Sequence, residues 1–210
     1  MSLGGAVRVK ICGITRLEDA KAAVSFGADA IGFVFAKSPR KISVQDAAGI
    51  SSAVGPWVAK IGVFVNSGVR EIMAVAVRTG LTAVQLHGDE ALYLIRDLQR
   101  RGLCVIRAFR VAAPQDLKEA GRSPAAALLF DALAPGVYGG TGRRFDWELL
   151  KNFKTKKPVI VSGGLTPANV RDAIKTFSPY GVDVSSGVEK KPGIKDAGLI
   201  REFIRNAKKN

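Results

Sequence analysis

Histidine and cysteine are scarce in this sequence. Its 210 residues include one histidine, His87, and two cysteines, Cys12 and Cys104. Structural zinc sites take ligands that are mostly of these two types, and a Ser-His-Asp triad needs an imidazole. Neither cysteine belongs to a C-x-x-C pair, so we expect two free thiols in a reducing compartment. The sequence therefore argues against a metal site and against triad chemistry.

Long apolar runs are also missing. No stretch approaches the roughly 18 apolar residues that a membrane-spanning helix requires. Residues 1–6 lack the apolar core of a signal peptide. We expect a cytoplasmic protein with no membrane partner, in which residues 1–5 are disordered or foreign to the natural chain.

Acidic residues are too few to balance the basic ones. The chain has 18 Asp and Glu against 32 Lys and Arg, a formal charge of +14, and such an excess is common in nucleic-acid-binding proteins. The basic residues are scattered, however, and no helix-turn-helix, RNA-recognition or zinc-finger pattern is present. We predict a solvated basic surface that attracts anionic metabolites and no nucleic-acid partner, with a polyanion-binding protein as the alternative.

Short apolar or β-branched runs alternate with longer amphipathic segments about every 25 residues, which predicts repeated βα units around a parallel sheet. Eight runs favour a closed (β/α)₈ TIM barrel over a doubly wound open sheet, which usually has about five or six strands. The length suits one domain spanning residues 1–210. The expected strands are residues 7–12, 29–35, 59–65, 83–87, 103–108, 126–131, 158–162 and 182–185, and the expected helices include 17–26, 69–78, 90–101, 167–176 and 197–207.

Glycines after the last two expected strands indicate a phosphate site. Barrel enzymes carry their chemistry at the carboxyl ends of the strands and often bind phosphate after strands seven and eight. Backbone N–H groups of glycine turns can approach an anion closely, although plain tight turns are the alternative. The candidate residues are Gly163, Gly164, Ser186 and Gly187, with Gly140 and Gly142 in a loop that could add donors or close over the ligand.

Cys12 and Asp131 are the candidate catalytic residues, since each ends an expected strand. Asp131 could instead cap a helix, but the next helix is expected only near Asp146, too far away. Cys12 alone would suit a buried apolar role, but its side chain should face the barrel mouth. Alternation places Lys10 on the same inward side, where its charge would favour the thiolate and where Asp183 is a plausible partner.

An ordered set of short motifs runs through nearly the whole chain. The motifs are 9–15 (VKICGIT), 27–33 (GADAIGF), 38–43 (SPRKIS), 62–66 (GVFVN), 84–88 (VQLHG), 139–142 (GGTG) with 145–147 (FDW), 162–165 (SGGL) and 182–189 (VDVSSGVE). Each motif alone is weak, but together and in this order they resemble the phosphoribosylanthranilate isomerase family. That resemblance implies a barrel enzyme that binds a small phosphosugar.

The resemblance also implies a reaction, the Amadori rearrangement of N-(5-phosphoribosyl)anthranilate to 1-(2-carboxyphenylamino)-1-deoxyribulose 5-phosphate in tryptophan biosynthesis. By this resemblance Asp131 is the general acid that opens the ribose ring, and Cys12 is the general base that removes the C2 proton. Arg40 holds the anthranilate carboxylate, a role that suits a planar guanidinium. No metal or other cofactor is needed, because the substrate's own iminium accepts the electrons. His87 and Asn66 stay outside the expected catalytic set, and the expected assembly is a monomer or a homodimer.

Two related barrel enzymes are the nearest alternatives, indole-glycerol-phosphate synthase and the aminoaldose isomerase of histidine biosynthesis. The synthase resembles a lysine and glutamate system and the histidine-pathway isomerase an aspartate pair, whereas this chain offers Cys12 with Asp131. Additional activity on the histidine-pathway substrate stays open at this point.

Overall fold

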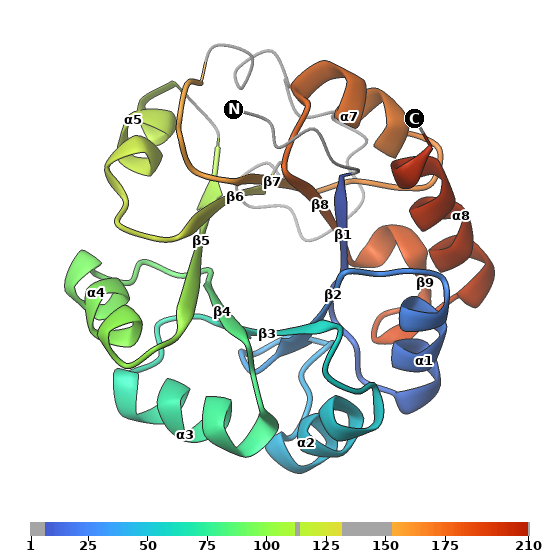
Figure 1. Ribbon diagram of the computed structural model, residues 1–210, viewed down its shortest axis with the longest axis horizontal. Helices are drawn as coiled ribbons and strands as arrows, with labels where there is room; N and C mark the ends of the chain where they lie inside the picture. The colour runs from blue at the N-terminus through green and yellow to red at the C-terminus, as the bar shows by residue number, and fades with distance from the viewer. Residues whose placement is uncertain (1–6, 112–113, 132–152, 210) are drawn as a thin grey trace.

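Eight parallel strands close into a barrel, each bonded to the next along the chain and the last to the first (Figure 1). The structure, a computed structural model, describes residues 7–111, 114–131 and 153–209. Closure confirms the predicted (β/α)₈ barrel and excludes the open sheet. The strands are β1 (Arg8–Ile11), β2 (Ala30–Val34), β3 (Ala59–Phe64), β4 (Ala83–Leu86), β5 (Cys104–Arg110), β6 (Ala127–Asp131), β7 (Val159–Ser162) and β8 (Gly181–Val184).

Helices surround the barrel on its outer side (Figure 1). The Ser43 side chain accepts a hydrogen bond from the Asp46 N–H at 3.0 Å and so caps the start of α2. Gly80 ends α3 in the left-handed conformation, with a φ of 62°. The helix expected near Asp146 lies outside the described residues. The helices are α1 (Leu17–Ser25), α2 (Val44–Ala53), α3 (Val69–Thr79), α4 (Leu92–Arg100), α5 (Pro114–Arg122), α7 (Val170–Phe177) and α8 (Ala197–Lys208).

Alternation along the strands divides the apolar core into two clusters. The larger cluster fills the space between the barrel and the helices and includes Ile11, Phe33 and Phe130. The smaller cluster lines the inside of the barrel and consists mainly of small and branched side chains, namely Ala30, Ile61, Ala83, Ile106, Ala108, Ala127, Leu129 and Ile160. The small residues inside the barrel leave room for longer polar side chains that are buried there, namely Lys10, Gln85 and Asp183.

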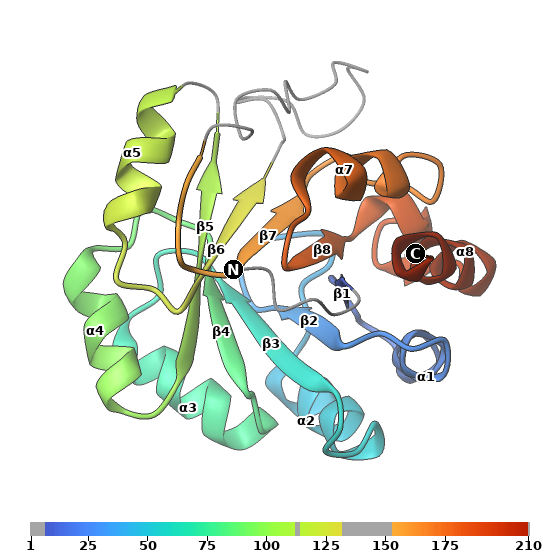
Figure 2. The ribbon, with the colours of Figure 1, turned by 45° about the horizontal axis from the view of Figure 1, so that its top comes forward.

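All strands of the barrel run in one direction, so their carboxyl ends meet at one end of it (Figure 2). The loop between β8 and α8 at that end carries structure of its own. It contains a short 3₁₀ helix, η1 (Ser186–Val188), and an antiparallel hairpin of β9 (Glu189–Lys191) and β10 (Ile194–Lys195). Among the described helices, none combines the length and the apolar character that a membrane span needs.

Candidate active site

Cys12 lies at the carboxyl end of β1, directly after its last residue, and is 8% exposed. Its N–H donates to the carbonyl oxygen of Val184 at 2.8 Å, which extends the pairing of β1 with β8. Lys10 lies two residues earlier on the same inward side. Its Nζ donates to Asp183 Oδ1 at 3.0 Å and to Gln85 Oε1 at 2.9 Å. The predicted pairing of Lys10 with Asp183 is therefore confirmed.

Burial and nearby cations act in opposite directions on the Cys12 thiol. Burial raises its pKa, the charges of Lys10 and Lys195 lower it, and the net result is a pKa above the usual value. For Lys10, burial lowers the pKa, but the charges of Asp183 and Cys12 outweigh burial and leave the pKa raised. Lys10 thus acts on Cys12 in the predicted direction, but burial outweighs it and leaves the pKa of the thiol raised.

A glycine on the neighbouring strand leaves space for both side chains. A Cβ at Gly32 of β2 would lie 2.8 Å from Cys12 Sγ and 3.1 Å from Lys10 Cε. The first distance is shorter than packed side-chain atoms tolerate, so any side chain at Gly32 would displace the thiol. Sequence reasoning missed this role, although Gly32 belongs to one of the motifs in the chain.

Asp131 is the last residue of β6 and reaches the same end of the barrel from another strand. Its Oδ2 lies 3.3 Å from Nε2 of His87, the residue that follows β4. The other ring nitrogen of His87, Nδ1, lies 3.3 Å from Nε2 of Gln85. Gln85 was not among the expected site residues, and His87 was expected to lie outside the catalytic set. Alternation along β4 is the signal for both, because it places them on the inward side with Ala83.

Arg40 lies in the loop after β2 and is held by a carboxylate of the chain itself. Its Nε and one terminal nitrogen donate to the two oxygens of Glu189 at 2.9 and 2.8 Å. A Cβ at Gly13 would lie 2.7 Å from Arg40 Cδ, so the arginine side chain passes over the residue directly after Cys12. The structure therefore places Arg40 beside Cys12 and holds it there through Glu189, and neither contact was predicted from the sequence.

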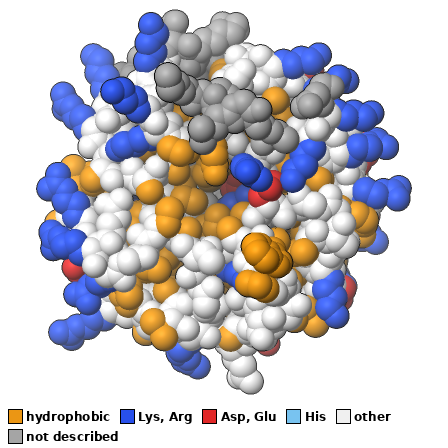
Figure 3. Space-filling view, viewed as in Figure 1, with side chains coloured by type: hydrophobic (Ala, Val, Ile, Leu, Met, Phe, Trp, Pro, Cys, Tyr) orange, Lys and Arg blue, Asp and Glu red, His pale blue; other side chains and the backbone are white. Residues whose placement is uncertain are grey.

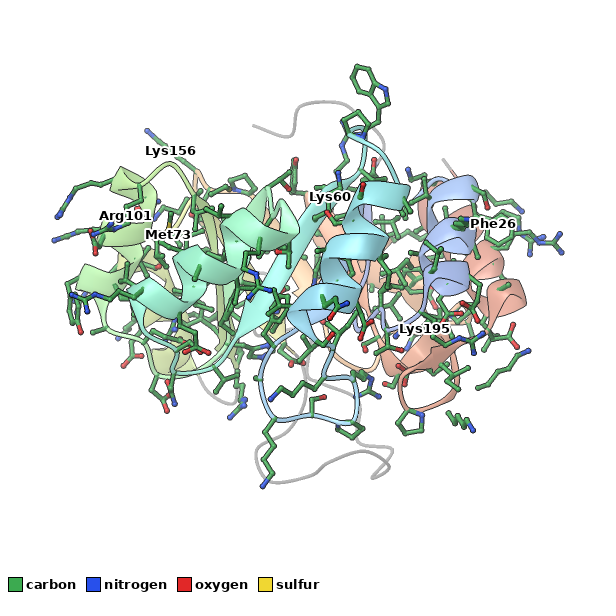
Figure 4. All side chains as sticks on the ribbon, turned by 90° about the horizontal axis from the view of Figure 1, so that it is seen from below. Phe26, Lys60, Met73, Arg101, Lys156 and Lys195 are labelled. Carbon is green, nitrogen blue, oxygen red and sulfur yellow. The ribbon has the colours of Figure 1, made fainter. Side chains whose placement is uncertain are left out.

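Glu189 bridges two cations. Lys195 Nζ donates to Glu189 Oε1 at 2.8 Å and to the Ser185 carbonyl at 3.1 Å. Burial raises the pKa of Glu189, but Arg40 and Lys195 outweigh burial and hold that pKa below its usual range. Burial lowers the pKa of Lys195. Lys195 lies toward the end of the barrel that carries the candidate site, and Lys60 lies toward the opposite end (Figure 4). Arg40 and Lys195 together carry more positive charge than Glu189 neutralises, and the remaining positive charge beside Cys12 suits an anionic ligand.

The glycine turns after β7 and β8 lie against each other. A Cβ at Gly187 would come within 1.9 Å of the Leu165 carbonyl oxygen, so only glycine permits this contact. Asn169 Nδ2 donates to the Gly164 carbonyl at 2.9 Å and thereby steadies the first turn. The structure thus brings together Gly163, Gly164, Ser186 and Gly187, whereas Gly140 and Gly142 lie outside the described residues.

The positions of Cys12, Asp131, Arg40 and the glycine turns determine what this end of the barrel can do chemically. Cys12 and Asp131 reach it from β1 and β6, which are separated by two strands on one side and four on the other. A ligand between them would meet one proton-handling group on each side, with Arg40 and the glycine turns near its anionic ends. In the part of the chain that the structure describes, no group of three or more His, Cys, Asp or Glu side chains could hold a metal ion.

Comparison with known proteins gives a consistent result. A family model for N-(5'-phosphoribosyl)anthranilate isomerase matches residues 9–206. The N-(5'-phosphoribosyl)anthranilate isomerase of Rubrobacter xylanophilus is 49% identical over 203 residues, which cover 96% of this chain and 98% of that protein. The crystal structure of the Thermotoga maritima phosphoribosylanthranilate isomerase is 48% identical with a TM-score of 0.91 and covers 96% of this chain and 98% of its own.

Two further solved structures concern a ligand and an assembly. One, 45% identical with a TM-score of 0.86, is a phosphoribosylanthranilate isomerase in complex with reduced 1-(o-carboxyphenylamino)-1-deoxyribulose 5-phosphate. The other, 44% identical with a TM-score of 0.86, shows monomers of the dimeric Thermotoga maritima isomerase. Each covers 96% of this chain and 98% of its own. The family model and these relatives match nearly the whole chain, and the chain therefore belongs to the phosphoribosylanthranilate isomerase family.

Proposed function

We propose that this chain catalyses the Amadori rearrangement of N-(5-phosphoribosyl)anthranilate to 1-(2-carboxyphenylamino)-1-deoxyribulose 5-phosphate, a step of tryptophan biosynthesis. One observation carries the proposal: Cys12 and Asp131 stand at the carboxyl ends of two separate strands of one barrel, so that they flank a common space. Family membership and the ligand named for a relative support the same reaction.

Asp131 acts in the first step as the general acid. It protonates the furanose ring oxygen, the bond from C1 to that oxygen breaks, and the anilino nitrogen lone pair forms the C1 iminium. A positioned acid lowers the barrier because the departing oxygen never carries a full negative charge. The open-chain substrate then remains bound through its phosphate and through the carboxylate of its anthranilate group.

Cys12 acts in the second step as the general base. Its thiolate takes the proton from C2, and the electron pair of that bond forms the C1–C2 double bond while the iminium nitrogen becomes neutral. The resulting enolamine is protonated at C1 and loses its O2 proton, which gives the ketone. The substrate's own iminium is the electron sink, so the chain needs no metal or other cofactor.

Anion-binding groups hold the two ends of the substrate. Arg40, fixed by Glu189, stands beside Cys12 and binds the anthranilate carboxylate. The backbone N–H groups of the turns at 163–164 and 186–187 bind the phosphate, with Gly140 and Gly142 adding donors from the preceding loop. Binding at both ends orients C1 and C2 between acid and base.

We also propose the setting in which the chain works. Residues 1–210 form a single domain that acts in the cytoplasm as a monomer or a homodimer, with a phosphosugar as its ligand and without a nucleic-acid or membrane partner. The dimeric state of a Thermotoga maritima relative supports the homodimer. Light scattering coupled to size-exclusion chromatography decides between the two states, and a larger assembly would contradict both.

A coupled assay tests the activity. N-(5-phosphoribosyl)anthranilate is generated in situ, and its consumption is followed with and without the protein. We expect saturable turnover that needs no added metal and survives a chelator. Absence of turnover by folded protein would overturn the proposed function. The aminoaldose of histidine biosynthesis serves as the comparison substrate, and we expect its turnover to be slower.

A further inference from the structure

A line of buried and partly buried side chains crosses the inside of the barrel from β8 to β6. It begins at Asp183, whose Oδ1 accepts from Lys10 Nζ at 3.0 Å, and Lys10 also donates to Gln85 Oε1 at 2.9 Å. Gln85 Nε2 lies 3.3 Å from His87 Nδ1, and His87 Nε2 lies 3.3 Å from Asp131 Oδ2. The line therefore joins the lysine beneath the proposed base to the proposed acid.

The chemistry of the donors fixes the direction of every hydrogen bond in this line. An ammonium group can only donate, so Gln85 must turn its oxygen toward Lys10 and its amide nitrogen toward His87. That nitrogen is also only a donor, so Nδ1 of a neutral His87 must accept and carry no proton. The proton of the ring then sits on Nε2, which faces Asp131.

We propose that His87 is a positioning residue for Asp131, and that Lys10, acting through Gln85, sets the tautomer in which His87 donates to that carboxylate. The catalytic consequence rests on the proposed function; the tautomer does not. The hydrogen bond from His87 Nε2–H to Oδ2 restrains the orientation of the Asp131 carboxyl group and leaves Oδ1 to carry the proton that is transferred. Such fixing keeps the proton-transferring oxygen at one place relative to the substrate.

The backbone around His87 is held independently of its ring. The His87 N–H donates to the Phe64 carbonyl at 2.9 Å. In the following turn the buried carboxylate of Glu90 accepts from the Gly88 N–H at 3.0 Å and from the Asn66 N–H at 2.9 Å, and it is also paired with Arg107. The imidazole is thus not needed to shape its own loop. Both of its nitrogens instead face inward-pointing side chains of the barrel.

Nuclear magnetic resonance offers a direct test, because His87 is the only histidine in the chain. Protein labelled with ¹⁵N in histidine alone reports both ring nitrogens of a single residue. In the folded protein near pH 8 we expect Nε2 to be protonated and Nδ1 to be unprotonated. A protonated Nδ1 in the neutral ring would overturn the proposal.

Two substitutions of Gln85 distinguish control of the His87 tautomer by Gln85 from the tautomer that an imidazole ring prefers by itself. Gln85→Glu replaces the amide donor by a carboxylate acceptor, so Nδ1 should become protonated. Gln85→Leu removes the donor and should leave a mixture of tautomers, while Lys10 keeps its bond to Asp183. The matched control is Gln99→Glu on α4, where the amide nitrogen donates to the Pro124 carbonyl at 3.1 Å, and it should leave the His87 signals unchanged. Unchanged tautomer populations in both Gln85 variants, with the fold intact by circular dichroism, would overturn the proposal.

Kinetics then tests the effect on Asp131. His87→Ala should lower kcat by about ten-fold to a hundred-fold, because displacement of a catalytic group by even about 1 Å can cost a rate factor of this order. KM should change by less than about three-fold, because in this proposal His87 acts through Asp131 and does not itself bind the substrate. His87→Gln keeps a side-chain donor and should recover part of kcat. An equal loss in both variants, or a loss in KM alone, would overturn the positioning role. If the Gln85 variants shift the tautomer as expected but the wild-type protein shows no turnover, the proposed function fails while the tautomer control stands.

Discussion

At the scale of single residues, the position of Cys12 on β1 determines both its exposure and its charge environment. Alternation along the strand puts Cys12 and Lys10 on one inward side, and this much follows from sequence alone. The net effect of burial and charge on the pKa of the Cys12 thiol does not follow from sequence, because it depends on how closely Lys195 and Gly32 approach from other parts of the chain. Lys10 is present as predicted, yet burial decides the direction in which the pKa of Cys12 shifts.

We expect Cys12→Ala to lower kcat by about 10²- to 10⁴-fold, the range for loss of a positioned base, and Asp131→Asn to do the same by preventing ring opening. The double variant should fall far less than the product of the two effects, because blocking either step already stops turnover. Steady-state assays of the three variants decide. If Cys12→Ala retains more than about a tenth of the wild-type kcat, well above what loss of a typical base leaves, Cys12 is a packing residue.

The raised pKa of Cys12 predicts a pH dependence. Because the base must be a thiolate, kcat/KM should rise with pH through and beyond neutrality, toward or above the usual thiol pKa of about 8.5. The profile is measured between about pH 6 and 9.5. Alkylation of Cys12 by iodoacetamide is a second readout, and it is followed in a Cys104→Ser background because Cys104 is an exposed free thiol. A rate that is flat across this range would contradict a buried thiol as the base.

Arg40→Ala should raise KM by roughly ten-fold or more, because a charge-assisted hydrogen bond to the carboxylate is lost in ground and transition states alike. Glu189 keeps its partner Lys195, so the fold should persist. The matched control is Arg101→Ala, which removes an exposed arginine at the end of α4. A fall in kcat with KM unchanged would contradict the anchoring role of Arg40.

At the scale of elements, the strands and helices with a regular hydrophobic period were predicted well, and short irregular segments were predicted poorly. The expected strand at 83–87 is β4 (Ala83–Leu86), and the expected strand at 126–131 is β6 (Ala127–Asp131). The hairpin of β9 and β10 was missed, because strands of three and two residues are too short to show an alternating pattern. Glu189 and Lys195 both lie on that hairpin, so the clamp on Arg40 was missed with it.

The contact between the two glycine turns yields a prediction. Gly187→Ala places a Cβ where the Leu165 carbonyl oxygen lies, so the turns must separate. Overpacking of this kind commonly costs about 1–3 kcal/mol, and inorganic phosphate should become a weaker competitive inhibitor. Urea denaturation and inhibition kinetics measure the two effects.

Gly49→Ala in α2 is the matched control, because a Cβ there meets nothing within 4 Å. It should stabilise the protein by roughly 0.5–1 kcal/mol, as alanine does inside a helix, and leave phosphate inhibition unchanged. If Gly187→Ala behaves like this control, the turns are not in the contact described.

At the scale of the whole molecule, Asp29 ties the two ends of the described chain together. It accepts from Arg8 at 2.9 Å and from the Val9 N–H at 2.8 Å, and it pairs with Lys208 of α8 at 2.9 Å. Burial raises the pKa of Asp29, but these partners outweigh burial and lower it below the usual range. The periodicity of the sequence predicts α8 but contains no sign of this contact, since its members are far apart along the chain.

A lowered pKa in the folded state means that Asp29 stabilises the fold above the unfolded pKa, about 3.9, and that this stabilisation is lost as the pH falls through the folded pKa. We expect Asp29→Asn to reduce the free energy of unfolding by about 1 kcal/mol at pH 7. The difference should shrink toward pH 3. Urea denaturation at both pH values measures it, with Glu119→Gln on the exposed side of α5 as the control. A deficit that is the same at pH 3 as at pH 7 would contradict the charge-based role.

The formal charge of +14 bears on whether the protein binds nucleic acids. Lys and Arg side chains stand around the rim of the face that Figure 3 shows, and apolar side chains occupy its centre, so that face presents no continuous basic track. Cations dispersed in this way meet few phosphates of one duplex at a time. The logarithm of the affinity falls with the logarithm of the salt concentration, with a slope proportional to the number of phosphates neutralised.

We therefore expect fluorescence anisotropy with duplex DNA and single-stranded RNA to show no binding tighter than the non-specific range of about 10⁻⁴–10⁻⁶ M at physiological salt. At low salt, weak binding should appear and should be equal for unrelated sequences, because scattered charges read no bases. The same basic surface should still raise the rate at which an anionic phosphosugar reaches the barrel, so kcat/KM should fall as salt increases. Tight binding that persists at physiological salt would instead mean that the positive charge serves a nucleic-acid partner.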